Sequence, residues 1–92
     1  MFQKVGPSSV RSDDGYLVRR ISRSCLIYEE NGLTLKIEVE IGVNDLAVYL
    51  SAATEWNIGE DDIRYLTQDE REKVMNRIQA ALKFLHVPHV IL

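Results

Sequence analysis

The order of hydrophobic and polar positions divides the chain into a β-rich first part and a helical last part. Between Leu33 and Ile41, apolar residues alternate strictly with polar ones, which is the period of a strand with one buried face. From Val74 to Leu85, apolar residues recur at spacings of three and four, as they do on one face of a helix. The pattern therefore predicts strands first and one long helix near the C-terminus.

A hairpin is predicted at Asn31-Gly32, between two β-type segments. A two-residue type I′ turn requires positive φ at both central residues, and Asn and Gly tolerate this best. Centring the turn on these residues places apolar side chains opposite one another, as Tyr28 opposite Leu35 and Leu26 opposite Ile37. Turn chemistry and alternation thus indicate the same register.

The other strands carry weaker patterns. We expect strands over residues 16–21, 24–29 and 46–50, and a short final strand over 89–92 at the sheet edge. Residues 22–23 fit either a turn or a bulge within one long strand, and residues 51–56 fit a single helical turn. Residues 1–15 are rich in loop chemistry and are expected to form a loop or flexible N-terminal segment, with an edge strand over 2–5 as the alternative.

The long helix has clear end signals. Thr67 and Glu70 have the spacing of a capping box, in which Thr67 is the N-cap and Glu70 reaches back to its backbone N–H. Asp69 and Lys73 have the spacing of a favourable i,i+4 ion pair. Pro88 disfavours continuation of the helix, so the helix is predicted to run from Gln68 to about His86.

These elements predict an α+β fold formed by residues 16–92 as a single domain. The expected architecture is an antiparallel sheet of four to five strands, with one long C-terminal helix packed on one face and a short final strand. An apolar fraction of 46% and a charged fraction of 27% are ordinary for a globular chain of 92 residues.

Cysteine count and hydropathy exclude several classes. Cys25 is the only cysteine, so the chain cannot form an internal disulfide and has too few ligands for a four-ligand Cys/His zinc site. No apolar stretch of 18 residues occurs, and residues 1–22 have no signal-peptide core. We expect a soluble, cytoplasmic protein without contact to a membrane, although a route of export that needs no such signal stays open.

Charge is distributed unevenly along the chain. Residues 1–24 carry five basic and two acidic residues, a net charge of +3, whereas residues 25–92 carry six basic and twelve acidic residues, a net charge of −6. Within residues 55–72, seven acidic residues against two basic ones give −5. A field of that sign attracts a cationic partner and repels nucleic acid. Capping and the helix dipole account for the acids at the helix start, but not for Glu60, Asp61 and Asp62.

No catalytic constellation is evident. Pro88 interrupts the pair His86 and His89, which has no third ligand, so no metal site is predicted. Cys25 has no histidine near it in sequence and is interpreted as a small buried hydrophobe. The chain lacks a phosphate-binding loop, a dinucleotide-binding glycine pattern and a nucleophile elbow. We therefore expect a protein that is not an enzyme and needs no cofactor.

The N-terminal cations are the best candidates for contact with nucleic acid. Arg19 and Arg20 are neighbours on a predicted strand, so their side chains point to opposite faces and do not form one patch. With a sequence pI near 5.3 and no basic stripe, nucleic-acid binding is not the favoured interpretation.

A family resemblance gives the chain a more specific hypothesis. The alternating strand 33–40, the strand 46–51, Trp56 with the acidic segment after it, and the cap and amphipathic helix that begin at residue 66 form one pattern. Over about residues 21–92 this pattern resembles the immunity protein 74 family of bacterial polymorphic toxin systems. The resemblance implies a protein that binds and neutralises a cognate toxin domain and catalyses no reaction.

The partner-binding residues expected on this hypothesis lie around the acidic segment. An aromatic side chain beside acidic residues can steer a basic protein and then anchor it. The candidate contacts are Trp56, Glu60, Asp61, Asp62 and Tyr65. A lone tryptophan is also common as a core or rim anchor, and that interpretation of Trp56 stays open. The alternative function is a general interaction or dimerisation module that uses the sheet edge or exposed sheet face, as in a homodimer.

Overall fold

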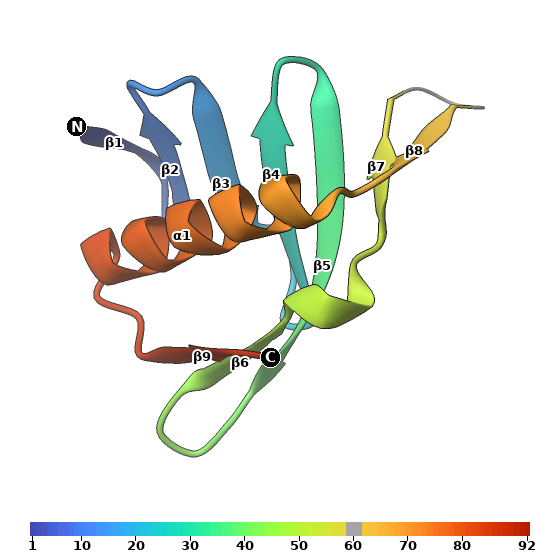
Figure 1. Cartoon of the computed structure of the whole chain (residues 1–92). Coiled ribbons are helices and arrows are strands. Elements are labelled where there is room, and N and C mark those ends of the chain that lie inside the picture. The colour runs from blue at the N-terminus through green and yellow to red at the C-terminus, as the bar shows by residue number, and fades with distance from the viewer. Residues whose placement is uncertain (59–61) are drawn as a thin grey trace.

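The computed structural model describes residues 1–58 and 62–92, with Ile63 described by its backbone alone. In this part of the chain, nine strands form one sheet and one α-helix, α1 (Gln68–Phe84), crosses one face of it (Figure 1). The strands are β1 (Phe2–Gly6), β2 (Ser9–Ser12), β3 (Tyr16–Arg20), β4 (Cys25–Glu30), β5 (Leu33–Ile41), β6 (Leu46–Tyr49), β7 (Glu55–Asn57), β8 (Ile63–Tyr65) and β9 (His89–Ile91). A 3₁₀ turn, η1 (Leu50–Ala52), follows β6.

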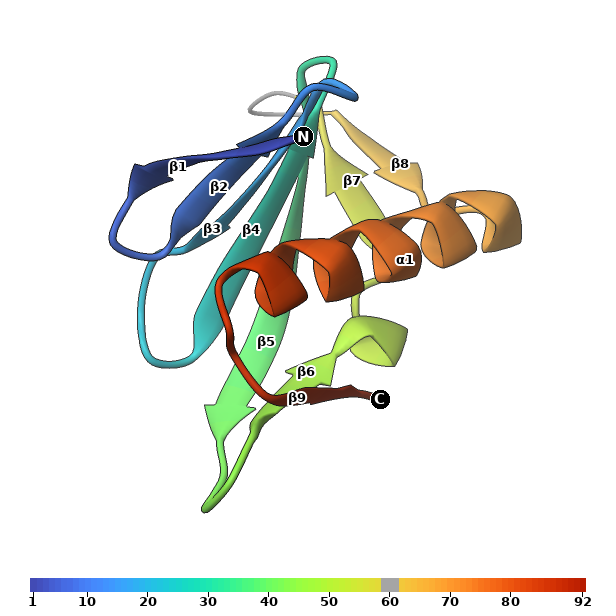
Figure 2. The same ribbon diagram turned by 90° about the vertical axis from the view of Figure 1, so that its left-hand side faces the viewer.

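The sheet curls into roughly half a barrel around the helix (Figure 2). Its main path is β1-β2-β3-β4-β5-β6-β9, and β7 and β8 form a side branch attached to β5. Neighbouring strands are antiparallel except β6 and β9, which are parallel. The α+β class, the helix on one face and the short final strand are confirmed. The expected four to five strands are an underestimate, because β1 and β2 at one end of the sheet, and β7 and β8 in the side branch, have weak sequence patterns.

The predicted β4–β5 hairpin is confirmed in its register. Tyr28 lies opposite Leu35 and Leu26 opposite Ile37. Asn31 and Gly32 have φ angles of 49° and 79°, as a type I′ turn requires. The longest strand pair of the sheet is therefore set by two turn residues and by the alternation of β5.

The first twelve residues form two strands in place of the loop expected over 1–15, and β1 corresponds to the alternative edge strand over 2–5. β1 and β2 pair with each other, and β2 pairs with β3. Val10 is fully buried, and the Phe2 ring lies 5.4 Å from that of Phe84 and 6.1 Å from that of Tyr16. These contacts with distant residues order two strands whose own sequences indicate little β-structure.

The helix begins as predicted and ends two residues earlier. The Thr67 hydroxyl accepts a hydrogen bond from the Glu70 backbone N–H at 3.1 Å, and the Glu70 carboxylate accepts one from the Thr67 N–H at 2.9 Å, which confirms the capping box. At the other end, His86 has a φ of 58°, and the Val87 N–H donates to the Leu82 carbonyl at 2.9 Å. This is a Schellman motif with histidine where glycine is usual.

One hydrophobic core lies between the helix and the concave face of the sheet. The helix contributes the predicted stripe, of which Val74, Ile78, Ala81 and Leu82 are buried and Met75 and Leu85 partly buried. The sheet contributes inward side chains from β2 to β7. Helix and sheet thus bury the faces that their sequence periods predict.

Candidate functional site

The five residues predicted to contact a partner do not share one environment. Trp56 lies in the middle of β7 and is 0% exposed, so the expectation of an exposed tryptophan is wrong. Tyr65, on β8, is 69% exposed, and Asp62 is exposed just before that strand. Glu60 and Asp61 lie outside the residues that the structure describes. Tyr65 and Asp62 are therefore the described candidates that a partner can reach.

The register of the β7–β8 hairpin explains why one aromatic is buried and the other exposed. Trp56 pairs with Arg64, and Glu55 pairs with Tyr65. Paired side chains share a face and neighbours along a strand alternate, so Trp56 and Tyr65 point to opposite sides. The Trp56 ring lies 5.9 Å from the Tyr28 ring in the core. The tryptophan thus anchors the hairpin to the sheet, which is the core-anchor interpretation of that residue.

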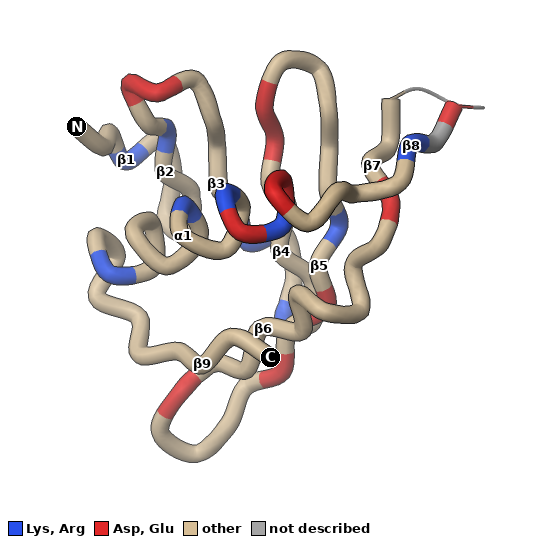
Figure 3. Tube along the Cα trace, in the orientation of Figure 1, with Lys and Arg blue, Asp and Glu red and all other residues tan. Residues whose placement is uncertain are grey.

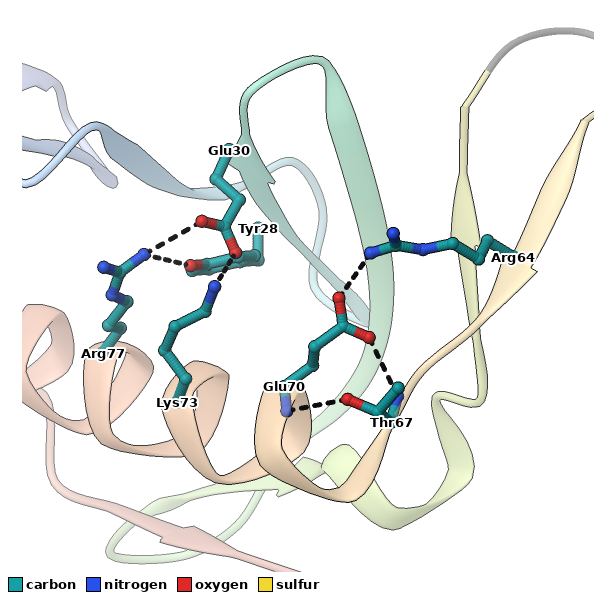
Figure 4. A network of polar contacts seen from close by, with 7 residues as sticks. All are labelled: Tyr28, Glu30, Arg64, Thr67, Glu70, Lys73 and Arg77. Carbon is teal, nitrogen blue, oxygen red and sulfur yellow. Dashed lines mark hydrogen bonds and ion pairs between the residues drawn. The ribbon is translucent and has the colours of Figure 1, made fainter.

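A polar cluster joins the hairpin to the start of α1 (Figure 4). The Glu70 carboxylate accepts hydrogen bonds from Thr67 and Arg64. The Thr67 backbone N–H is the main cause that lowers the pKa of Glu70, and Arg64 adds to it. The Trp56 Nε1–H also helps to lower the pKa of Glu70. Its geometry is not that of a hydrogen bond, so this buried N–H has no hydrogen-bond partner among the described residues. The cap therefore positions β8 as well as the helix.

A second cluster joins α1 to the end of β4 (Figure 4). Glu30 is only 8% exposed and forms ion pairs with Lys73 at 2.9 Å and Arg77 at 3.1 Å. Arg77 also donates to the Tyr28 hydroxyl at 3.0 Å, and burial raises the pKa of that hydroxyl to about 12. Lys73 thus pairs with Glu30, so the predicted i,i+4 pair with Asp69 is wrong. A carboxylate from a distant strand offers Lys73 a less exposed partner.

The lowered pKa of Glu70 predicts a pH-dependent contribution to stability. The carboxylate stabilises the fold at pH values above the unfolded pKa of 4.5, and this contribution is lost as the pH falls through the lower folded pKa. Glu70→Gln keeps a capping oxygen but loses the charge, so we expect a loss of about 0.5–1 kcal/mol at pH 7. Urea unfolding at pH 7 and at pH 3 should show that the difference shrinks in acid. Asp69→Asn, in the same helical turn, is the control, and equal losses at both pH values would contradict the assignment.

Acidic residues occur along the β7–β8 hairpin and in the first turns of α1 (Figure 3). Four nearby cations are held by internal partners: Arg64 by Glu70, Arg71 by the carbonyl oxygens of Leu50 and Ala53, and Lys73 and Arg77 by Glu30. The exposed Lys36 of β5 lines a hollow with Asn57 and Ile58 of the hairpin and is the nearby cation without an ion pair among the described residues. Four acids of the hairpin and the first helical turns form no ion pair and no side-chain hydrogen bond with a described residue: Glu55, Asp62, Asp69 and Glu72. The acidic hairpin surface is defined as the exposed Tyr65 with Glu55 on its face of the hairpin, together with Asp62, Asp69 and Glu72 around the helix start. It carries four acids that form no ion pair with a described residue.

The remaining candidate residues, His89 and Cys25, contact backbone carbonyl oxygens of residues close to them in sequence. His89 Nδ1 lies 2.9 Å from the Val87 carbonyl oxygen, and the partly buried Cys25 contacts the Leu26 carbonyl. Within residues 1–58 and 62–92, no three His, Cys, Asp or Glu side chains are grouped so as to hold a metal ion. Among the described residues, no helix is long and apolar enough to cross a membrane.

Glu30 is a buried charged residue that the sequence analysis did not single out. The signal available in the sequence was its position in the strand alternation, since Leu26, Tyr28 and Glu30 lie on the same face of β4. A carboxylate on the same strand face as core residues requires a cationic partner. The helix supplies two, Lys73 and Arg77.

Comparison with known proteins does not assign the chain to a family. No family model matches the chain, no curated protein matches it, and no solved structure matches it.

Proposed function

We propose that this chain is a small non-catalytic binding protein whose acidic hairpin surface docks onto a basic protein. The observation that carries the proposal is an exposed tyrosine on a hairpin that adjoins a helix start, with four acids there that form no ion pair with a described residue. Tyr65 is 69% exposed, and Ile58, at the end of the same hairpin, is 44% exposed. An exposed amphipathic aromatic is typical of interface anchors, and nearby acids without ion pairs favour a cationic partner.

We further propose that the partner is a bacterial toxin domain, which the chain neutralises as an immunity protein. This specific function rests on the resemblance of residues 21–92 to the immunity protein 74 family. A surface of net negative charge supports it, because it can cover the cationic surface of a toxin that acts on nucleic acid. The complex would then block the toxin by occlusion, with no reaction catalysed.

The first experiment is co-expression with the product of the neighbouring coding sequence, where that product has a toxin-like domain, followed by pull-down and a growth assay. Co-purification and restored growth are the expected results. A neighbouring toxin domain that is neither bound nor neutralised would refute the immunity proposal for that pair.

Variants then test the surface itself. Asp62→Lys is expected to slow association several-fold at low salt and to weaken its salt dependence, because it removes part of the steering field. Tyr65→Ala is expected to weaken binding by about tenfold through faster dissociation. Surface plasmon resonance at two salt concentrations measures both effects.

The control for charge is Asp45→Lys, which makes the same change of two units at the exposed β5–β6 turn. It should leave the kinetics nearly unchanged. Equal effects of Asp45→Lys and Asp62→Lys would show that overall charge, and no local surface, governs association.

A second candidate function is a dimerisation module that uses a sheet edge. Among the described strands, β1 and β9 end the main path and each pairs with a single neighbour. Val90 and Leu92 expose apolar side chains at the β9 edge, a feature that favours strand addition. Size-exclusion chromatography with light scattering distinguishes the two, because a stable homodimer supports the module and a monomer supports the binding protein.

A further inference from the structure

A small cavity lies between the C-terminal end of α1 and the concave face of the sheet. Its volume is about 90 Å³. Its inner wall is apolar and buried, with Val18, Leu26, Leu46 and Leu82 contributing to it. Because an apolar cavity of about 150 Å³ can hold benzene, about 90 Å³ has room for a branched alkyl group of three or four carbons.

Two cations stand at the opening of this cavity on the inward face of the sheet. Lys4 lies opposite Val10 on β2, and Arg20 lies opposite Leu26 on β4. Val10 and Leu26 are core residues, and paired residues share a face. Both cations thus occupy positions where strand alternation places an apolar side chain, a local exception of the kind found at functional sites.

The opening itself lies at the turn between β1 and β2, because Lys4 and Pro7 are the exposed residues of the lining. Neither Lys4 nor Arg20 forms an ion pair within the described residues. The Arg20 guanidinium donates to two backbone carbonyl oxygens, from Nε to Ser22 at 3.2 Å and from Nη2 to Arg23 at 3.5 Å. A shallow hollow that shares Arg20 with the cavity adds the exposed Arg23. No acidic residue lines either space. The site therefore combines an apolar floor with a cationic rim.

We propose that this cavity binds a small carboxylate that carries a branched alkyl group. The alkyl group fills the apolar floor, and the carboxylate pairs with Lys4 and Arg20 in a charge-assisted contact. Two sources offer this chemistry: a free short-chain acid and the C-terminal valine or leucine of a peptide. The cavity lies at the opposite end of α1 from the acidic hairpin surface (Figure 1), so the proposal does not depend on the proposed function.

The test is a titration of the full chain with 3-methylbutanoate, followed by the NMR methyl signals of Val18, Leu26 and Leu82. We expect saturable binding in the millimolar range, with contacts between ligand methyls and these side chains. Acetate lacks the alkyl group and 3-methylbutan-1-ol lacks the charge, so each should bind at least tenfold more weakly. Equal binding of either, or no saturable binding of the acid, would overturn the proposal.

Variants locate the carboxylate. The double variant Lys4→Gln, Arg20→Gln is expected to weaken binding of 3-methylbutanoate at least tenfold. The matched control Arg11→Gln, Lys36→Gln removes the same charge from exposed residues that lie outside the cavity, and should bind as the native chain does. Native affinity in the Lys4 and Arg20 variant, with a folded NMR spectrum, would overturn the assignment.

Peptides distinguish the two sources. A tetrapeptide ending in valine is titrated with a free and with an amidated C-terminus. Tighter binding of the free peptide than of 3-methylbutanoate supports a chain end as the ligand, and binding of the acid alone supports a free short-chain acid. Equal binding of the free and the amidated peptide would contradict a carboxylate ligand.

Discussion

Replacing Trp56 by alanine is expected to lower the free energy of unfolding by about 3–5 kcal/mol. The side chain is 0% exposed and contacts the Tyr28 ring in the core, so its removal leaves a cavity that the short β7 cannot close. A domain of this size has a total stability on the order of 5–10 kcal/mol. The variant should therefore lie close to its unfolding midpoint, and its strongest disorder is expected in the β7–β8 hairpin.

Urea unfolding followed by far-ultraviolet circular dichroism measures this effect without the tryptophan signal. Trp56→Phe is the matched control and is expected to lose only about 1–2 kcal/mol, because Nε1 makes no hydrogen bond with a described residue. Tyr65→Ala, on the opposite face of the hairpin, should change stability by less than about 0.5 kcal/mol. A loss below about 1 kcal/mol for Trp56→Ala would contradict the anchor role.

The same variants separate anchoring from recognition. If the acidic hairpin surface binds a partner, Trp56→Phe keeps the hairpin in place and should retain binding. Tyr65→Ala keeps the fold and should weaken binding by about tenfold. The two aromatic residues of one hairpin then have different roles, one in the core and one at the interface.

The parts of the fold that were predictable from sequence are those determined by local chemistry. Asn31-Gly32 specifies a turn type by its positive φ angles, and the alternation of β5 then leaves one register that buries the apolar face. Thr67 and Glu70 likewise specify the helix start through two hydrogen bonds between near neighbours. In both cases the determining residues are close in sequence.

The parts that were missed depend on contacts between residues far apart in sequence. β7 and β8 have three residues each, too few for a periodic pattern, and their pairing is stabilised by burial of Trp56 against β4. β1 and β2 are ordered by Phe2 and Val10, which pack in a core that α1 also forms. Sequence reasoning identified the acidic segment as a candidate site but could not decide which aromatic faces solvent.

The alternation of a strand also indicates which of its charged residues lie on the buried face. Tyr16, Val18 and Arg20 share one face of β3, so the alternation that buries Val18 also places Arg20 at the core side. The same phase places Glu30 among core residues on β4. Both exceptions lead to a structural finding, a cationic cavity rim in one case and an internal ion-pair cluster in the other.

Glu30→Gln is expected to lower the free energy of unfolding by about 2–3 kcal/mol. The substitution preserves shape but removes the charge that pairs with Lys73 and Arg77, two residues of α1 that are 43 and 47 positions away in the chain. Because Glu30 is nearly buried, its contribution is little screened by solvent. The loss should therefore persist at high salt.

Glu29→Gln provides a control on the neighbouring residue of the same strand. Glu29 also pairs with an arginine, at 3.1 Å, but its side chain is 37% exposed, and exposed pairs contribute at most about 1 kcal/mol. A double-mutant cycle of Glu30→Gln with Arg77→Met, measured by urea unfolding, isolates the pair from other effects. Equal losses for Glu29→Gln and Glu30→Gln, or a coupling energy near zero, would contradict the view that this cluster attaches the helix to the sheet.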